Sequence, residues 1–425
     1  MALRFRPHES LSHITKVLRQ YLHLPDPQVL YVVLGTVAGN HLPGPPVWTM
    51  LIGGPSAGGS TLVTSLLGYV SHDDEILVDP VRNTYALDNV KGAAAFLSAS
   101  PKRERARDAT GGILRQISAD GGTGVLVMSD FTNILNLRNE QQAEVIACLR
   151  MIYDGKFVRA VGTDGAKVLK WHGKVGCITK STGAIESHHA VIGEMGQRFI
   201  MWRYTTTLGH SECLKMLAVK SKRDMDMDIA KAVGTHLNHT LDVIAKGDTP
   251  LELEVYESQW ITHAAQLICR ARSVVKRDKY KSDIIEFIPP PEGPTRLAGE
   301  LKSLFLGMQA AGVEDSDAHK VLTSMLWGSM QSIRGNILQC TIAAMRAKGA
   351  PFHKNRFTNE DIDAGVMARA EVDGYRMTSP PTIRRNMEDI EHLGMIKRVN
   401  GVRSKRIEWV LADDIAGLCR ELRIL

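Results

Sequence analysis

The chain has 425 residues, of which 44% are hydrophobic and 23% charged, as in ordinary globular proteins with two or three domains. Its net charge of +6 is suited to an acidic partner such as nucleic acid. A mildly basic protein without such a partner is about equally expected. We find no signal peptide, no apolar run of membrane-spanning length and no C-x-x-C pair among the six cysteines. We therefore expect a cytoplasmic protein with reduced cysteines, and we exclude zinc ribbons and thioredoxin-type redox motifs.

The first informative feature is a strand that leads into a glycine-rich loop. Residues 10–45 have helical spacing in two pieces, and the prolines of residues 41–46 break the chain. Residues 47–62, VWTMLIGGPSAGGSTL, then approach the phosphate-loop template G-x-x-x-x-G-K-[ST]. The predicted nucleotide-binding positions are Gly53, Pro55, Ser56, Ala57, Gly58, Gly59, Ser60 and Thr61. Backbone N–H groups of such a loop can bind phosphate, but Gly59 replaces the lysine, so we do not expect fast hydrolysis.

A second apolar run, residues 124–130, ends in an acid and has the composition of a buried parallel strand. Asp130 stands where a carboxylate can hold Mg²⁺ together with the Ser60 hydroxyl. The glutamate that often follows such an aspartate is absent, because Phe131 stands there. An acid at a strand end is also often a helix cap, so both interpretations stay open. A helix is predicted around residues 141–153.

Residues 157–161 and 167–171 flank the turn GTDG and predict a β-hairpin. Its cations Arg159, Lys167 and Lys170 are suited to gripping a nucleic-acid backbone. Exposed hairpins also carry lysines for solubility, and we weigh the two interpretations equally.

Two more strands are predicted at residues 175–178 and 199–202, and their alternation with helices indicates a parallel α/β sheet. Thr182, after the first of them, is a candidate sensor of the terminal phosphate, or else part of a hydrogen-bonded turn. Lys180 beside it could supply the charge that Gly59 lacks. Arg198 is a candidate arginine finger that acts across a subunit boundary, with a surface salt bridge as the alternative.

Residues 207–345 have a helical pattern throughout, apart from a proline-rich break at 288–294. The last 80 residues then predict an amphipathic helix from Pro380 and two strands joined across the turn Asn400-Gly401. This order is typical of a winged helix-turn-helix, a module that binds DNA or serves only for contacts with other proteins. The predicted DNA contacts are Arg384, Arg385, Lys397, Arg398, Arg403, Lys405 and Arg406.

Taken together, these motifs resemble the AAA+ P-loop ATPases of actinobacterial phages and integrated elements. The similar segments are residues 43–58, 109–116 (ATGGILRQ), 130–135 (DFTNIL), 184–191 (AIESHHAV), 196–199 (GQRF) and 294–297 (PTRL). The resemblance implies an α/β fold with an AAA+ P-loop parallel sheet, a helical lid and a C-terminal winged helix-turn-helix. It also implies ATP and Mg²⁺ between the subunits of a ring, with a hexamer as our guess. Asp130, Thr182, Arg198 and Arg296 are its catalytic candidates. The chain departs from the family at Gly59 and Ser129, where lysines are usual.

The corresponding segments are 1–46 (helical), 47–206 (nucleotide-binding core), 207–345 (lid) and 346–425 (winged helix). The leading hypothesis is a phage or mobile-element helicase or replication initiator in the cytoplasm of a bacterial host. DNA and other replication proteins would be its partners, without a membrane. The alternative is a DNA-binding regulator built on a catalytically degraded ATPase scaffold, so whether the chain is an enzyme stays open.

Overall fold

The computed structural model describes the chain in segments that form two compact units. Those segments are residues 7–22, 27–54, 58–98, 111–162, 167–188, 195, 197–204, 214, 217–219, 221–247, 252–278, 281, 284–347, 356–372, 379–399 and 407–424. The first unit comprises Met1–Glu252 with Gly299–Leu322, and the second comprises Leu253–Ala298 with Thr323–Leu425. Within the described segments, no helix has both the length and the apolar composition needed to cross a bilayer.

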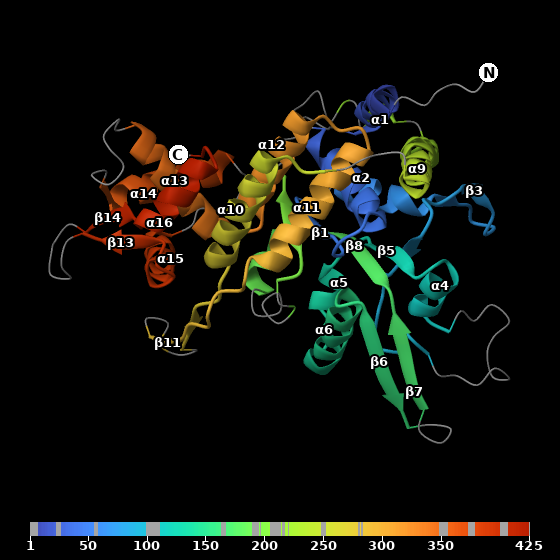
Figure 1. Ribbon diagram of the computed structural model, residues 1–425, viewed down its shortest axis with the longest axis horizontal. Coiled ribbons are helices and arrows are strands. Elements are labelled where there is room, and N and C mark those ends of the chain that lie inside the picture. The colour runs from blue at the N-terminus through green and yellow to red at the C-terminus, as the bar shows by residue number, and fades with distance from the viewer. Residues whose placement is uncertain are drawn as a thin grey trace. The chain divides into compact units, whose positions relative to one another are not determined.

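The first unit is built on a five-stranded sheet with the order β4-β5-β8-β1-β9, in which all neighbours are parallel. Its strands are β1 (Trp48–Ile52), β4 (Thr84–Ala86), β5 (Thr123–Met128), β8 (Lys174–Ser181) and β9 (Ile200–Arg203) (Figure 1). The predicted α/β class with a parallel sheet is confirmed. The edge strand β4 was not predicted, because three residues are too few to show a period.

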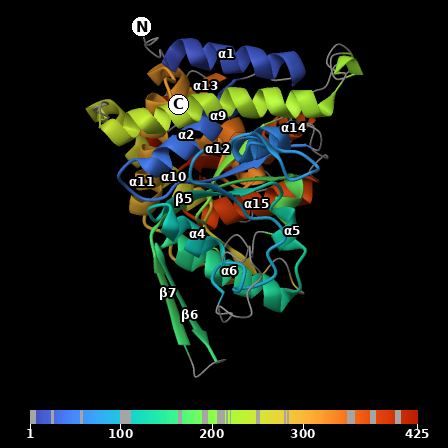
Figure 2. The ribbon, with the colours of Figure 1, turned by 90° about the vertical axis from the view of Figure 1, so that its right-hand side faces the viewer.

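Helices cover both faces of this sheet. On one face, the alternating side chains Trp48, Met50 and Ile52 join an apolar core. That core also receives residues of α4 (Ile113–Ala119), α5 (Thr132–Leu135) and α6 (Asn139–Tyr153). The opposite face contacts α2 (Gln28–His41) and α3 (Gly59–Thr64). Helices α1 (Pro7–Tyr21) and α9 (Lys222–Lys246) lie side by side (Figure 2).

Buried polar bonds position β1, the strand that precedes the glycine-rich loop. The Asn40 amide donates to the Val47 carbonyl at 3.0 Å and accepts from the Val47 N–H at 2.9 Å, which joins the end of α2 to β1. The Trp48 indole donates to the Val175 carbonyl at 2.7 Å. Gly176 has no room for a β-carbon, because the Asn40 amide fills that space. These bonds fix the position of β1, the strand after which the glycine-rich loop begins.

Helix α2 packs closely against α11 (Thr295–Ala310) through glycines. A β-carbon on Gly39 would overlap the Ser303 carbonyl, and one on Gly307 would overlap the Gly35 carbonyl. Such close approach of two backbones is available only to glycine. The predicted helical segment before residue 47 therefore belongs to the same unit as the sheet.

The predicted hairpin is confirmed as β6 (Lys156–Val161) and β7 (Lys167–His172), in the register Val158↔Lys170. It extends well beyond the sheet as a two-stranded arm (Figure 1, Figure 2). A smaller pair, β2 (Tyr69–Val70) and β3 (Ile76–Val78), was not predicted.

The helix that follows the glycine-rich loop is short. Helix α3 gives way to a 3-10 turn, η1 (Ser65–Leu67), and Gly68 has a φ of +69°. The hydroxyls of Thr64 and Ser65 bond back to the carbonyls of Ser60 and Leu62, at 2.9 and 2.7 Å. Such bonds compete with the helical pattern, which explains the early end.

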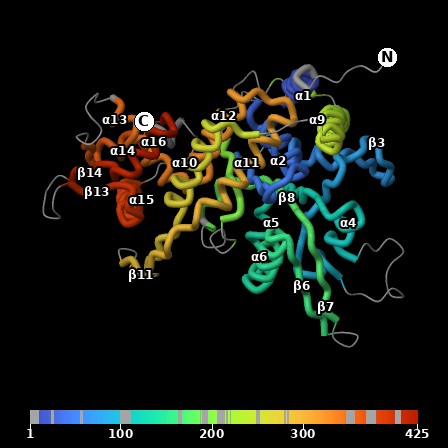
Figure 3. The backbone as a smooth tube through the Cα atoms, in the orientation of Figure 1, coloured from blue at the N-terminus to red at the C-terminus, as the bar shows by residue number. Residues whose placement is uncertain are grey.

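The second unit is mainly helical, and Figure 3 traces its path. Its helices are α10 (Val255–Ala271), α13 (Ser332–Ala347), α14 (Asn359–Val372), α15 (Pro380–His392) and α16 (Asp413–Glu421). Helices α11 and α12 (Asp315–Gly328) belong partly to each unit. An antiparallel sheet has the order β12-β14-β13, with β12 (Phe357–Thr358), β13 (Ile396–Arg398) and β14 (Glu408–Leu411). The pair β10 (Lys276–Arg277) and β11 (Ile285–Phe287) lies in the stretch 207–345, which was predicted to be helical apart from a break at 288–294.

A buried ion cluster holds this second unit together. One Asp389 oxygen accepts from Arg277 at 2.7 and 3.0 Å, and the other accepts from Arg334 at 3.0 Å. Arg334 also donates to the Ser273 carbonyl at 2.6 Å. Since Arg334 is 5% exposed and Asp389 8%, the charges depend on one another for compensation.

Candidate functional site

Hydrogen bonds join the segments that follow β5, β1 and β9 to the last residues of the neighbouring strands. The Phe131 N–H donates to the Lys180 carbonyl at 2.8 Å, and the Gly53 N–H donates to the Ser181 carbonyl at 3.2 Å. In the same way, the Tyr204 N–H donates to the Ile52 carbonyl at 3.0 Å. The end of β8 therefore lies between the acid-bearing segment and the glycine-rich loop. Ligands of open α/β sheets bind at this carboxyl edge.

The glycine-rich loop has the predicted order of strand, loop and helix. Gly58 adopts a left-handed φ of +77°, and α3 begins at the next residue. Ser60 is exposed and Thr61 is partly buried in the first turn. The first N–H groups of a helix have no partner within it and favour anions. The predicted positions Pro55, Ser56 and Ala57 lie outside the described residues.

Tyr204 fills the inner side of this loop. A β-carbon on Gly59 would overlap the Tyr204 hydroxyl oxygen, and one on Gly53 would overlap the phenol ring. Burial raises the pKa of Tyr204 to about 12, with the nearby Gly59 amide acting in the opposite direction. The hydroxyl oxygen is buried, and the described residues offer it no hydrogen bond of ordinary geometry. Tyr204 was not predicted as a site residue.

Lys180 runs beside the same point. Its Cγ lies 3.6 Å from the position of a β-carbon on Gly59, and the residue is only 8% exposed. Its backbone is held by the neighbouring strand β1, in the register Leu51↔Lys180. Within the described segments, no hydrogen bond or ion pair engages its ammonium.

Asp130 follows β5, as predicted. One of its oxygens accepts from the Thr132 N–H at 2.9 Å, so the carboxylate does cap the short helix α5. It also lines a hollow of about 140 Å³ with Asp88 and Lys91. Ser129, where the resemblance leads us to expect lysine, donates its hydroxyl to Asp88 at 2.8 Å. The metal role of Asp130 stays a prediction beside this capping role.

No three His, Cys, Asp or Glu side chains of the described segments gather into a metal-binding group. The predicted Mg²⁺ site is of another kind, with one carboxylate and one hydroxyl. Mg²⁺ keeps several waters and is commonly bound by one or two carboxylates together with substrate phosphates.

The other catalytic candidates are engaged in local contacts. The Thr182 carbonyl accepts from the Ile185 N–H at 3.2 Å, at the start of the 3-10 helix η3 (Gly183–His188). Arg198 donates to both oxygens of Asp154, at 2.9 and 3.0 Å. Its guanidinium also lies 5.1 Å from the Tyr153 ring centroid, and its side chain is 11% exposed.

Arg296 belongs to the second unit, where it pairs with Glu292. The same glutamate accepts from Arg272 at 2.8 Å. This arrangement gives Arg296 a partner at the start of α11.

The cations of the hairpin lie in different surroundings. Arg159 donates to the Leu97 carbonyl at 2.6 Å and thereby anchors the arm. Lys167 and Lys170 are exposed, on opposite faces. The face that carries Lys170 has no acid; its members are Lys156, Val158, Ala160, Val168, Lys170 and His172. All of them are exposed.

The predicted DNA contacts of the tail are also divided. Arg384 and Arg385 are exposed on α15, whereas Arg398 bonds Glu391 at 2.9 Å and stacks on Trp409 at 4.9 Å. Lys397 makes an exposed ion pair of 3.5 Å with an aspartate of α16. Arg403, Lys405 and Arg406 lie outside the described residues.

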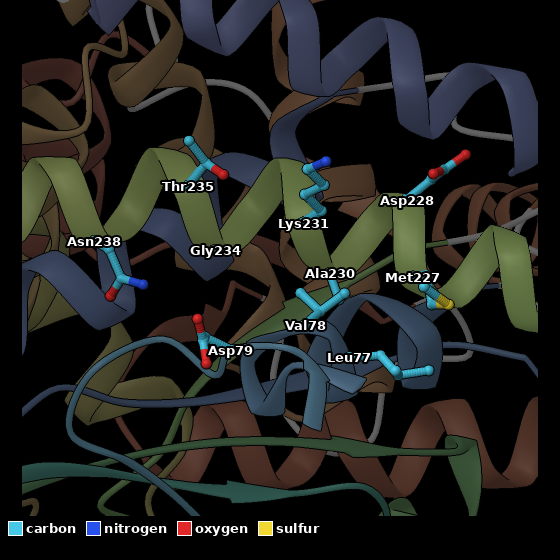
Figure 4. Close-up of a pocket in the computed structure, with 10 residues that line it drawn as sticks. All are labelled: Leu77, Val78, Asp79, Met227, Asp228, Ala230, Lys231, Gly234, Thr235 and Asn238. Atoms are coloured by element: carbon cyan, nitrogen blue, oxygen red, sulfur yellow. The ribbon is translucent and has the colours of Figure 1, made fainter. Parts of the chain in front are cut away.

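A larger hollow of about 420 Å³ lies elsewhere in the first unit, between residues 77–79 and α9 (Figure 4). Its lining combines Lys231 with Asp79 and Asp228, so its charges are mixed. Asp228 also accepts from the Tyr21 hydroxyl at 2.5 Å. We assign this hollow no role.

A scan of the chain against protein-family models gave no match, and a search of curated proteins gave none either.

Proposed function

We propose that the chain binds ATP and Mg²⁺ at the carboxyl edge of its sheet and acts on DNA as a phage or mobile-element replication ATPase. One observation carries the proposal: the glycine-rich loop and the Asp130 segment flank the end of β8, joined to it by hydrogen bonds of 3.2 and 2.8 Å. The order β4-β5-β8-β1-β9 supports the resemblance to AAA+ ATPases, because one strand separates the loop-bearing strand from the acid-bearing strand.

The residues at this edge suit a nucleoside triphosphate. The open N–H groups after Gly58 would hold phosphate oxygens. The Ser60 hydroxyl and the Asp130 carboxylate would hold Mg²⁺, and Thr182 would orient a water. Bound ATP supplies the phosphoanhydride bond whose cleavage drives such proteins. In a homo-oligomeric ring, Arg198 of one copy would face the nucleotide of the next after exchanging its bond to Asp154.

Two exposed surfaces support DNA as the partner. The order α13, β12, α14, α15, β13 and β14 supports a winged helix-turn-helix, with α15 as the recognition helix. Arg384 and Arg385 are exposed near the start of α15, where such helices contact bases. The hairpin arm offers Lys167 and Lys170 to the phosphate backbone.

A second candidate function is a DNA-binding regulator with an ATPase scaffold that no longer turns over. Two observations favour it: Tyr204 leaves no space for a side chain at position 59, and Arg198 is bonded to Asp154 in its own unit. A replication ATPase should hydrolyse ATP faster with DNA and form closed rings. A regulator should bind a defined duplex site without turnover. ATP hydrolysis with and without DNA, together with the mass of the assembly by light scattering, separates the two.

A further inference from the structure

Two hydrogen-bond donors that have no acceptor among the described residues belong to side chains beside Gly59. The first is the Lys180 ammonium, on a residue that is 8% exposed and has no partner among the described side chains. The second is the Tyr204 hydroxyl, whose oxygen is buried beside the Gly59 amide and has no hydrogen-bond acceptor among the described residues. Burying an unpaired hydroxyl is unfavourable, and an ammonium without a counter-ion favours an anion, so the described residues leave both donors open to an external partner.

The location indicates what that partner is. The Tyr204 hydroxyl oxygen occupies the β-carbon position of Gly59, and the Lys180 Cγ lies 3.6 Å from that position. A phosphate loop places its lysine ammonium from this residue. From Cγ, the Lys180 chain has three further atoms with which to reach a phosphate beside the loop.

We propose that Lys180 and Tyr204 together replace the missing loop lysine and donate to the terminal phosphates of the nucleotide. This inference rests on the proposed function, since it names the donors of the same site. The ammonium would come from strand β8 in place of the loop, and the phenol would add a neutral donor. A triphosphate satisfies both donors at once, whereas a nucleoside without phosphates satisfies neither.

The two donors should have opposite effects on the free protein and on its complex. Without nucleotide, neither donor has an acceptor among the described residues, so its removal should leave stability unchanged or raised. With nucleotide, each bonds to an anionic oxygen, and charge-assisted hydrogen bonds are the strong ones. A purely structural residue would not show this reversal.

The test measures binding of Mg-ATP by calorimetry and the unfolding temperature with and without nucleotide. The variants are Lys180→Met, Lys180→Gln and Tyr204→Phe, compared with the native chain. Lys246→Met, an exposed lysine in the last turn of α9, is the control for loss of one positive charge. AMP and ADP are titrated beside ATP, because a donor to the terminal phosphates should matter least for AMP.

We expect Lys180→Met and Lys180→Gln to weaken ATP binding by about tenfold or more, and Tyr204→Phe by about three- to tenfold. The free variants should unfold at or above the native temperature, and Lys246→Met should match the native chain. Native ATP affinity in both Lys180 variants and in Tyr204→Phe would overturn this inference and leave the proposed function standing. Loss of stability in both nucleotide-free Lys180 variants would also overturn it, because it would reveal a structural lysine. If the native chain binds no Mg-ATP, the proposed function itself fails.

Discussion

The phenol of Tyr204 occupies the space into which a side chain at Gly59 would extend. The same ring packs on Gly53, so Tyr204 leaves no space for a β-carbon at either Gly53 or Gly59. Glycine at position 59 is therefore a packing requirement of this fold. Restoring the usual lysine there requires a change at Tyr204 as well.

We predict that Gly59→Lys alone lowers the free energy of unfolding by about 1–3 kcal/mol, because it overpacks the loop against Tyr204. It should create no ATP hydrolysis. Adding Tyr204→Ala should recover part of the stability, so the two changes are non-additive. Urea unfolding measures both effects.

The matched control is Gly54→Lys, in the same loop, because a β-carbon on Gly54 meets no atom within 4 Å. It should stay within about 0.5 kcal/mol of the native chain. Equal stability of Gly59→Lys and Gly54→Lys would show that Tyr204 does not exclude a side chain.

Asp389→Ala should destabilise the second unit by about 3–5 kcal/mol, because it leaves the buried Arg334 without its carboxylate partner. Asp413→Ala is the control, since the Asp413 side chain is 88% exposed and its removal should change little. Hydrogen exchange over residues 379–399 reports the loss locally. Unchanged protection in Asp389→Ala would contradict the role of this ion cluster.

The pH dependence of stability should include a contribution from His236. Burial lowers the pKa of His236 to about 4, and its neutral ring lies 3.0 Å from both the Ser10 hydroxyl and the Ala311 carbonyl. The unfolded chain takes up this proton below about pH 6.5, whereas the folded chain does so only near pH 4. Stability from this group is thus complete above pH 6.5 and is lost as the pH falls towards 4. The loss approaches about 3 kcal/mol.

Unfolding by urea at a series of pH values tests this expectation, with His236→Gln as the comparison. Burial and nearby cations also lower the pKa of His41 to about 4, so the variant should keep part of the slope. An unchanged slope between pH 6.5 and 4 in His236→Gln would count against the contribution of His236.

Removal of Lys167 and Lys170 should weaken DNA binding through the hairpin. If each contacts a phosphate, the double alanine variant should reduce the slope of log affinity against log salt by about 0.7–0.9 for each lost contact. Arg159→Met should instead lower stability, because Arg159 anchors the arm to the Leu97 carbonyl. Lys246→Ala serves as the charge control. DNA affinity and salt slope equal to those of the native chain would remove the hairpin from the DNA-binding surface.

The sequence predicted most of the sheet, because β1, β5 and β8 are apolar runs bounded by turn residues. It missed the short pairs β2–β3 and β10–β11, which show no hydrophobic period. It also assigned Arg159 and Arg398 to DNA by charge alone. Their partners Leu97 and Trp409 are identified only by the folded backbone.

The candidate site was predicted in the same partial way. Motif spacing located Asp130 and Lys180 at strand ends and Gly58 in the loop after β1, and the parallel sheet brings these segments together. Tyr204 was not predicted, because its role depends on packing between the segments that follow two different strands, which no local sequence pattern encodes. Its position directly after β9, at the same edge, is the signal that could have suggested it.

The most direct test of the nucleotide site is calorimetric titration of the native chain with Mg-ATP, beside the variant Asp130→Asn and a titration without Mg²⁺. We predict saturable binding of one nucleotide per chain, weakened both by Asp130→Asn and by removal of Mg²⁺. No heat and no thermal stabilisation of the folded native chain at millimolar Mg-ATP would contradict a nucleotide site at the carboxyl edge of this sheet.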